Sequence, residues 1–198
     1  MADTGRVYAG TVTVDSMNTL NWGTAGIYGT GIKCLAVDDD PTVNPTDAYQ
    51  ENTTFGIWVT DWGFDFASGD TIDGLKVEFL ARSDAGSGIC YFPNVKLCSN
   101  YNSSSMIGTA KSIAGFDSST YIWQEVGDDE DHWGVSGGLT PEILNSSTFG
   151  VAWNMKFAEQ GGFGDVMQVD AVSMTVYYTE SGGEPASQTN AIFFGANI

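Results

Sequence analysis

The sequence predicts an all-β fold: a two-sheet antiparallel jelly-roll sandwich with one short helical turn and flexible terminal tails. Short runs rich in β-branched and aromatic residues are separated by clusters of Gly, Asn, Asp and Ser, which favour strands joined by tight turns. No long amphipathic helical period is visible, and no repeat of fixed length indicates a propeller, solenoid or fibre shaft. We expect one domain over residues 1–179, followed by a linker and an apolar tail over residues 180–198.

Alternation of apolar and polar residues places the strands along the chain. They are expected at residues 6–14, 26–37, 54–66, 71–82, 92–99, 106–114, 121–126, 147–158 and 165–179. Within 71–82, Leu75 and Val77 point to one face while Lys76 and Glu78 point to the other. This strand is therefore expected to have one buried face and one face exposed to solvent.

Two stretches interrupt the strand pattern. Residues 37–53 contain three consecutive acids and two prolines, so we expect a polar loop that runs over the surface. Residues 139–145 have the apolar spacing of a single helical turn, with Pro141 early and Thr140 as the N-cap. The one helical turn of the fold is expected there.

The charge of the chain restricts its partners. Only 7 Lys and Arg residues stand against 25 Asp and Glu residues, and the net charge is -18. Binding to nucleic acid needs clustered cations, so we predict no nucleic-acid partner. The opening residues lack the features of a secretory signal, and no segment is long and apolar enough to span a bilayer. We therefore expect synthesis in the cytoplasm and no membrane partner.

Acidic residues are numerous enough to imitate a glycosidase pair, for example Asp61 with Asp65 or Asp165 with Asp170. Such a pair needs a defined separation and one carboxyl group with a raised pKa, and chance pairs are expected among 25 acids. No Ser, Cys or Lys stands in a recognisable nucleophile motif. We predict that the chain is not an enzyme.

Metal and cofactor sites are not indicated either. The acidic stretches 38–40 and 127–134 do not follow the spacing of an EF-hand, and solvated acidic loops are more common than calcium sites. His132 is the only histidine, and the three cysteines form no CxxC pair. Cysteines of this kind are usually small buried hydrophobic residues. We predict no metal and no cofactor.

Tryptophan offers an alternative function, because sugar-binding sandwiches stack pyranose rings on aromatic side chains. Trp58 and Trp62 share one face if residues 54–66 form a regular strand, and they are then candidate sugar contacts. The competing interpretation is that these large side chains fill the two inner faces of the sandwich. Both interpretations remain open at this point.

Three segments occur in an order that resembles a jelly-roll module of tailed-bacteriophage virion proteins. They are residues 62–79, 131–153 and 169–179, and the stretch from residue 62 to residue 179 that contains them is more than half of the chain. The matching residues are Thr71, Ile72, Gly74, Val77, Trp133, Gly134, Leu139, Thr140, Asn145, Phe149, Gly150, Val151, Val169, Asp170, Val172, Thr175, Val176, Tyr177 and Tyr178. At His132, this sequence has a histidine where the family pattern has an apolar residue.

The resemblance implies a structural virion protein. Its most direct form is a capsid decoration (cement) protein that binds and stabilises the phage head, with the major capsid protein as its partner and a homotrimer as its oligomeric state. The expected location is the capsid surface of the virion, after synthesis in the host cytoplasm. The alternative is a glycan-binding jelly-roll module of a tail or fibre protein, which would contact a host glycan. The shared residues are apolar, Gly or turn formers and bring no catalytic residues, so Asp170, Trp133, Gly74, Thr140 and Asn145 are expected to be structural.

Asp170 stands in an apolar row that contains Val172, Met174, Val176 and Tyr178. Its membership in the family pattern favours a structural carboxylate over a catalytic one. We expect Asp170 to lie at the start of its strand and to accept hydrogen bonds from exposed turn amides.

The apolar tail is the predicted partner contact. Ile192, Phe193 and Phe194 follow a linker rich in Gly, Pro and Ser. An extended apolar segment of this kind adds a strand to the sheet edge of a neighbour, or it folds back on its own domain. Both alternatives remain open.

Overall fold

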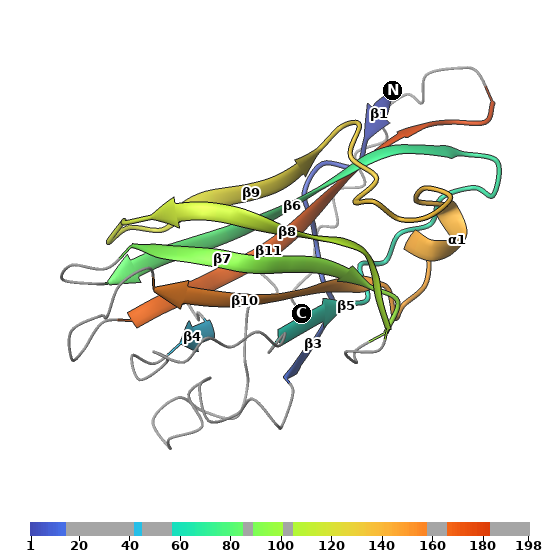
Figure 1. Cartoon of the computed structure of the whole chain (residues 1–198). Coiled ribbons are helices and arrows are strands. Elements are labelled where there is room, and N and C mark those ends of the chain that lie inside the picture. The colour runs from blue at the N-terminus through green and yellow to red at the C-terminus, as the bar shows by residue number, and fades with distance from the viewer. Residues whose placement is uncertain (15–41, 45–56, 85–88, 101–104, 158–165, 183–198) are drawn as a thin grey trace, which may run out of the picture.

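The structure, a computed structural model, describes residues 1–14, 42–44, 57–84, 89–100, 105–157 and 166–182. These residues form two antiparallel sheets that lie face to face, with one short helix at an end (Figure 1). The predicted all-β sandwich is therefore confirmed.

The first sheet is organised around β11, its most extensively paired strand. Its path is β1 (Ala2–Asp3), β11 (Val166–Thr179), β6 (Thr71–Asp84) and β9 (Ile122–Asp128), and β2 (Val7–Tyr8) and β4 (Thr42–Asn44) also pair with β11. The second sheet has the order β3 (Thr11–Val14), β5 (Ile57–Thr60), β10 (Gly150–Phe157), β7 (Cys90–Cys98) and β8 (Met106–Phe116).

Successive strands alternate between the sheets. From β5 onward, the chain crosses to the other sheet at every connection except the β7–β8 hairpin. This wrapping of the chain around both sheets is the arrangement expected of a jelly-roll sandwich. It brings residues from distant parts of the sequence together at each end of the molecule.

The core between the sheets has an aromatic centre. The ring of Phe79 in β6 lies 4.6 Å from that of Phe92 in β7 and 5.3 Å from that of Trp153 in β10, centroid to centroid. All three side chains are buried. Aromatic pairs stabilise a core beyond the burial of their area, so this cluster holds the two sheets together.

The helical turn lies where it was predicted. Helix α1 spans Pro141–Leu144, with Thr140 as its N-cap. The Thr140 hydroxyl accepts a hydrogen bond from the backbone N–H of Ile143 at 3.3 Å. The buried Leu144 then anchors the helix on the core.

Three expectations differ from the structure. The amino-terminal residues are not a tail, because β1 pairs with the end of β11. The expected surface loop contains a strand, β4, which pairs with β11 near its start. The expected strand over residues 54–66 ends at Thr60, because Asp61 has φ 63° and turns the chain out of the sheet. The expected strand at residues 26–37 and the tail residues 183–198 lie outside the described residues.

Candidate ligand-binding groove

A groove with a volume of about 580 Å³ lies where the segment after β5 meets the end of β11 and the amino-terminal segment. We call it the end groove. It is lined by Thr4, Val7, Gly63, Phe64, Asp65, Phe66, Ala67, Asp70, Tyr178, Glu180, Ser181 and Gly182. The volume falls within the range of small-molecule sites in proteins.

Aromatic rings form one wall of the end groove. The ring of Phe66 lies 5.5 Å from that of Phe64 and 5.0 Å from that of Tyr178, between centroids, and it meets Tyr178 edge-on. Phe64 also stacks on the buried Trp62 at 6.4 Å. Phe66 is buried, whereas Phe64 and Tyr178 are partly exposed. A ligand in the groove would therefore meet the rings of Phe64 and Tyr178.

The chain from Asp61 to Phe66, which we call the aromatic segment, is held at both ends. At its start, Asp61 and Gly63 have φ of 63° and 68°, and these left-handed residues direct the chain away from β5. At its end, the Asn145 side chain accepts a hydrogen bond from the Phe66 N–H at 2.9 Å and donates one to the Phe66 carbonyl at 2.8 Å. This two-point contact fixes the backbone of Phe66 beside helix α1.

Asp70 holds the opposite rim of the end groove. Its carboxylate accepts hydrogen bonds from the backbone N–H groups of Ala67 at 2.9 Å and Ser181 at 3.0 Å. These bonds tie the turn before β6 to the chain that follows β11. At Gly69 in this turn, a Cβ atom would lie 2.8 Å from the Ser181 Cβ, so a side chain would force the two segments apart.

The electrostatic environment of the end groove is negative. Asp65, Asp70 and Glu180 line it, and among the described lining residues there is no Lys, Arg or His. Burial raises the pKa of the Tyr178 phenol, and the charges of Glu180, Asp70 and Asp3 raise it further. The groove therefore offers aromatic surface and hydrogen-bond acceptors, and it disfavours anions.

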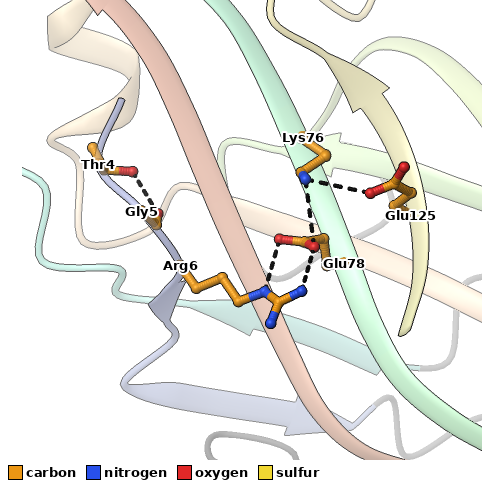
Figure 2. A network of polar contacts seen from close by, with 6 residues as sticks. All are labelled: Thr4, Gly5, Arg6, Lys76, Glu78 and Glu125. Atoms are coloured by element: carbon orange, nitrogen blue, oxygen red, sulfur yellow. Dashed lines mark hydrogen bonds and ion pairs between the residues drawn. The ribbon is translucent and has the colours of Figure 1, made fainter. Parts of the chain in front are cut away.

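The amino-terminal segment contributes Thr4 and Val7 to the groove. Thr4 is bonded to Val176 of β11 twice, through its N–H to the Val176 carbonyl and through its hydroxyl to the Val176 N–H, both at 3.1 Å. Next to it, Arg6 makes two hydrogen bonds to the Glu78 carboxylate, at 2.8 and 3.2 Å. Figure 2 shows the Arg6 side chain reaching across β11 toward Glu78 on β6.

Glu78 is the centre of this polar network on the outward face of the first sheet. Its side chain is only 3% exposed. Lys76 approaches Glu78 at 3.4 Å and Glu125 of β9 at 3.3 Å, and Arg6 lies over the Trp123 ring at 3.9 Å (Figure 2). Burial alone would raise the pKa of Glu78, but the hydrogen bond from Arg6 and the charges of Lys76 and Arg6 lower it below its ordinary value. The charges of the network compensate one another, so its role is to fasten the amino-terminal segment to the sheet.

The two tryptophans predicted to contact sugar are closed to a ligand. Trp58 is 2% exposed and packs with Cys98 and Ala152, whereas Trp62 is 3% exposed and belongs to the main core. They do not share a strand face, because β5 ends before the left-handed Asp61. The prediction that Trp58 and Trp62 stack on a sugar is therefore wrong.

Trp133 and Gly74 make structural contacts. The Trp133 indole N–H donates to the Leu75 carbonyl at 2.8 Å, and the Trp133 backbone N–H donates to Asp131 at 2.7 Å. A Cβ atom at Gly74 would lie 2.3 Å from the backbone of Asp129, so the loop after β9 approaches β6 closely only because Gly74 has no side chain. Together these contacts close one end of the sandwich.

Asp170 does not lie at the start of its strand beside exposed turn amides. It is the fifth residue of β11, at an irregularity between Val169 and Ala171 in the pairing with β6, and it is 1% exposed. The predicted position is therefore wrong, because β11 begins four residues before Asp170 and its pairing with β6 is irregular at this residue. A structural role for Asp170 stays a prediction.

The remaining predicted residues have plain outcomes. The proposed partner contacts Ile192, Phe193 and Phe194 lie outside the described residues. Cys90 and Cys98 are buried, as expected, and burial raises the pKa of Cys98 to about 12. Among the described residues, no group of three or more His, Cys, Asp or Glu is arranged to hold a metal ion. No helix in the described part of the chain combines the length and apolarity needed to cross a membrane.

Sequence reasoning did not identify Phe64, Tyr178 and Glu180 as groove residues. The signal in the sequence was the alternation of aromatic residues at 62, 64 and 66, with an acid at Asp65. Read as a strand, this alternation predicts one buried aromatic face. Phe64 lines the groove beside the end of β11 because Asp61 and Gly63 are left-handed and turn the chain out of the strand.

No family model matches the sequence, and no curated protein matches it. Among solved structures, the chain is similar to the CBM22-1–GH10 modules of the Clostridium thermocellum endo-1,4-β-D-xylanase 10B complexed with xylohexaose. The identity is 7%, the TM-score is 0.32, and the match covers 75% of this chain and 26% of that chain. A similarity of this size supports no statement about the ligand of this chain.

Proposed function

We propose that this protein is a glycan-binding β-sandwich module whose end groove takes a short oligosaccharide. The observation that carries the proposal is the combination of partly exposed aromatic rings with carboxylates in one groove, whose described lining includes no cationic residue. A pyranose ring has apolar C–H faces and a rim of hydroxyl groups, and it therefore needs both kinds of surface.

Each part of the groove has a role in this binding. The rings of Phe64 and Tyr178 provide the surface on which an apolar sugar face stacks. Asp65 and Glu180 make no hydrogen bond or ion pair with other described residues, so their oxygens are available to accept hydrogen bonds from sugar hydroxyls. Phe66 and Asp70 keep the two walls in place through their own contacts.

The first test is titration calorimetry of the whole chain with a panel of neutral oligosaccharides. We predict that Phe64→Ala weakens binding of the best ligand by about fivefold or more, because a stacked aromatic contributes about 1 kcal/mol or more to a site. Tyr121→Ala is the matched control, since Tyr121 is also a partly exposed aromatic but lies outside the groove, beside Arg82. Equal affinities of the two variants, with both folded, would refute the assignment of the groove.

The same samples test the expectation that the chain is not an enzyme. Oligosaccharides incubated with the protein and separated by chromatography are expected to remain intact. Release of shorter sugars that is lost in Asp65→Asn or Glu180→Gln would contradict that expectation, because both carboxylates line the groove.

We also propose capsid decoration as a second candidate function, on the basis of the sequence resemblance. It is supported by the contacts of Trp133, Gly74, Thr140 and Asn145, which maintain the sandwich, as the resemblance implies for residues of a structural module. In this proposal a homotrimer binds the major capsid protein on the virion surface.

Density-gradient fractionation of particles from the source virus tests the second candidate. A ratio near one copy per major capsid protein would support decoration, and sedimentation of the purified chain would report whether it is a trimer. Absence of the chain from particles would refute this proposal, whereas a few copies per particle would favour a tail or fibre role with a host glycan as ligand.

A further inference from the structure

We propose that the end groove selects amino sugars that carry a protonated amine over neutral and anionic sugars. This inference rests on the proposed glycan-binding function and names the class of sugar. It starts from the charges that line the groove: Asp65, Asp70 and Glu180 are present, and none of the lining residues that the structure describes is Lys, Arg or His.

The three carboxylates do not have equivalent roles. Both oxygens of Asp70 are engaged, one with the Ala67 N–H and one with the Ser181 N–H, so Asp70 shapes the rim. Asp65 and Glu180 have no hydrogen bond or ion pair with other described residues. They are the two acceptors that an ammonium group on the ligand would meet, and a charged donor gives a stronger hydrogen bond than a hydroxyl group.

The aromatic wall favours the same ligand. An ammonium group near the face of a Phe or Tyr ring is attracted by the electrons of the ring. Phe64 and Tyr178 are both partly exposed at the groove and lie on either side of the buried Phe66. A protonated amino sugar therefore gains from the rings and from the carboxylates, whereas a neutral sugar gains from stacking and hydroxyl contacts only.

The cations of the first sheet do not offset the negative charge of the groove. Arg6 is engaged with Glu78, and Lys76 is shared between Glu78 and Glu125 on the outward face of the sheet. None of these residues lines the groove. A uronic acid or a sulfated sugar would bring its negative charge beside Asp65 and Glu180 without a counter-charge, and its binding is therefore disfavoured.

The test is calorimetric titration of the whole chain with tetramers of glucosamine, N-acetylglucosamine and glucose, at a pH at which the free amine is protonated. The glucosamine tetramer is expected to bind about tenfold tighter than the other two at low salt, since the exposed Asp65 and the partly exposed Glu180 each contribute a factor of a few. This advantage is expected to shrink as the salt concentration rises.

The double variant Asp65→Asn/Glu180→Gln should abolish the preference while the neutral tetramers still bind. Its matched control is Asp117→Asn/Glu130→Gln, which removes two exposed carboxylates outside the groove and should keep the preference. A control that loses the preference equally would overturn the proposal, because the effect would then come from overall charge.

The outcomes separate this inference from the function on which it rests. Equal binding of the three tetramers overturns the amino-sugar preference and leaves glycan binding intact. No binding of any tetramer, with the protein folded, overturns both. A tetralysine peptide that binds as tightly as the glucosamine tetramer and competes with it also overturns the inference. The groove would then recognise positive charge and not a sugar.

Discussion

Glu78 carries a negative charge on the outward face of β6 and is nevertheless only 3% exposed. Such burial is costly unless the charge is paired and hydrogen-bonded. Arg6 supplies two hydrogen bonds from the amino-terminal segment, and Lys76 adds a second positive charge from the neighbouring position of β6. A single carboxylate thus attaches the start of the chain to the sheet.

The lowered pKa of Glu78 predicts how stability depends on pH. The ordinary value is 4.5, and the folded-state value lies below it. The stabilising contribution is therefore complete at pH values above 4.5 and is lost as the pH falls through the lower folded-state value. Glu78→Gln is expected to lower the free energy of unfolding at pH 7 by about 1–3 kcal/mol and to weaken the loss of stability in acid.

Urea denaturation of the wild type and Glu78→Gln at several pH values below 7 checks this prediction. Glu142→Gln is a suitable control, because Glu142 is exposed and makes no ion pair among the described residues. A Glu78→Gln curve parallel to that of the wild type in acid would contradict the assigned role of the carboxylate.

At the scale of single elements, helix α1 and the aromatic segment form one unit. Asn145, at the end of the helix, holds the backbone of Phe66 through two hydrogen bonds. Thr140, at the start of the same helix, caps it without contacting the aromatic segment. A substitution at Thr140 therefore tests the stability of the helix, whereas a substitution at Asn145 also tests the position of the groove wall.

We predict that Asn145→Ala weakens ligand binding and lowers stability by about 1–3 kcal/mol, because two hydrogen bonds to Phe66 are lost. Thr140→Ala is expected to lower stability by about 1 kcal/mol, the usual cost of a lost N-cap, with binding nearly unchanged. Thermal denaturation and titration of both variants provide the comparison. Equal binding by the two would show that the Asn145 contact does not position the groove.

How far the sequence predicts each element depends on whether its conformation is set by local pattern. The strands around Leu75 and Val172 were predicted because alternation and burial agree there. The strand through Asp61 was predicted too long, because aspartate gives only a weak local signal for a left-handed backbone. Glu78 was expected to be exposed to solvent. Its burial was not predicted, because the residue that covers it, Arg6, lies 72 positions away in the sequence.

The end groove was not predicted because it is a product of tertiary structure. Its residues come from the amino-terminal segment, the segment after β5 and the end of β11. Tyr178 lies in a strand that pattern analysis predicts well, but its exposure depends on Phe66 packing against it. Of the expected structural residues, Thr140 was predicted correctly as a cap, because capping is encoded within a few residues.

At the scale of the whole molecule, β11 is the strand on which the first sheet depends. It pairs with β1, β2, β4 and β6, and only the β6–β9 pairing of this sheet does not involve it. A chain that ends at residue 165 is therefore predicted to remain largely unfolded, because it would expose the apolar faces of both sheets. A chain that ends at residue 182 is the control and is expected to fold, since the predicted domain ends at residue 179.

Far-ultraviolet circular dichroism and cooperative thermal unfolding of the two truncated chains check this prediction. Native-like cooperative unfolding of the chain ending at residue 165 would show that the second sheet is stable alone. Failure of the chain ending at residue 182 would instead show that the last residues are part of the domain.

The pairing of β1 with the end of β11 also orders events during translation. Residues 2 and 3 pair with residues 178 and 177, so β1 leaves the ribosome long before the part of β11 with which it pairs. At about 5–20 residues per second, that delay lasts on the order of ten seconds or more. The nascent β1 segment remains accessible throughout this interval to chaperones and proteases, and also to neighbouring copies of the same strand on a polysome.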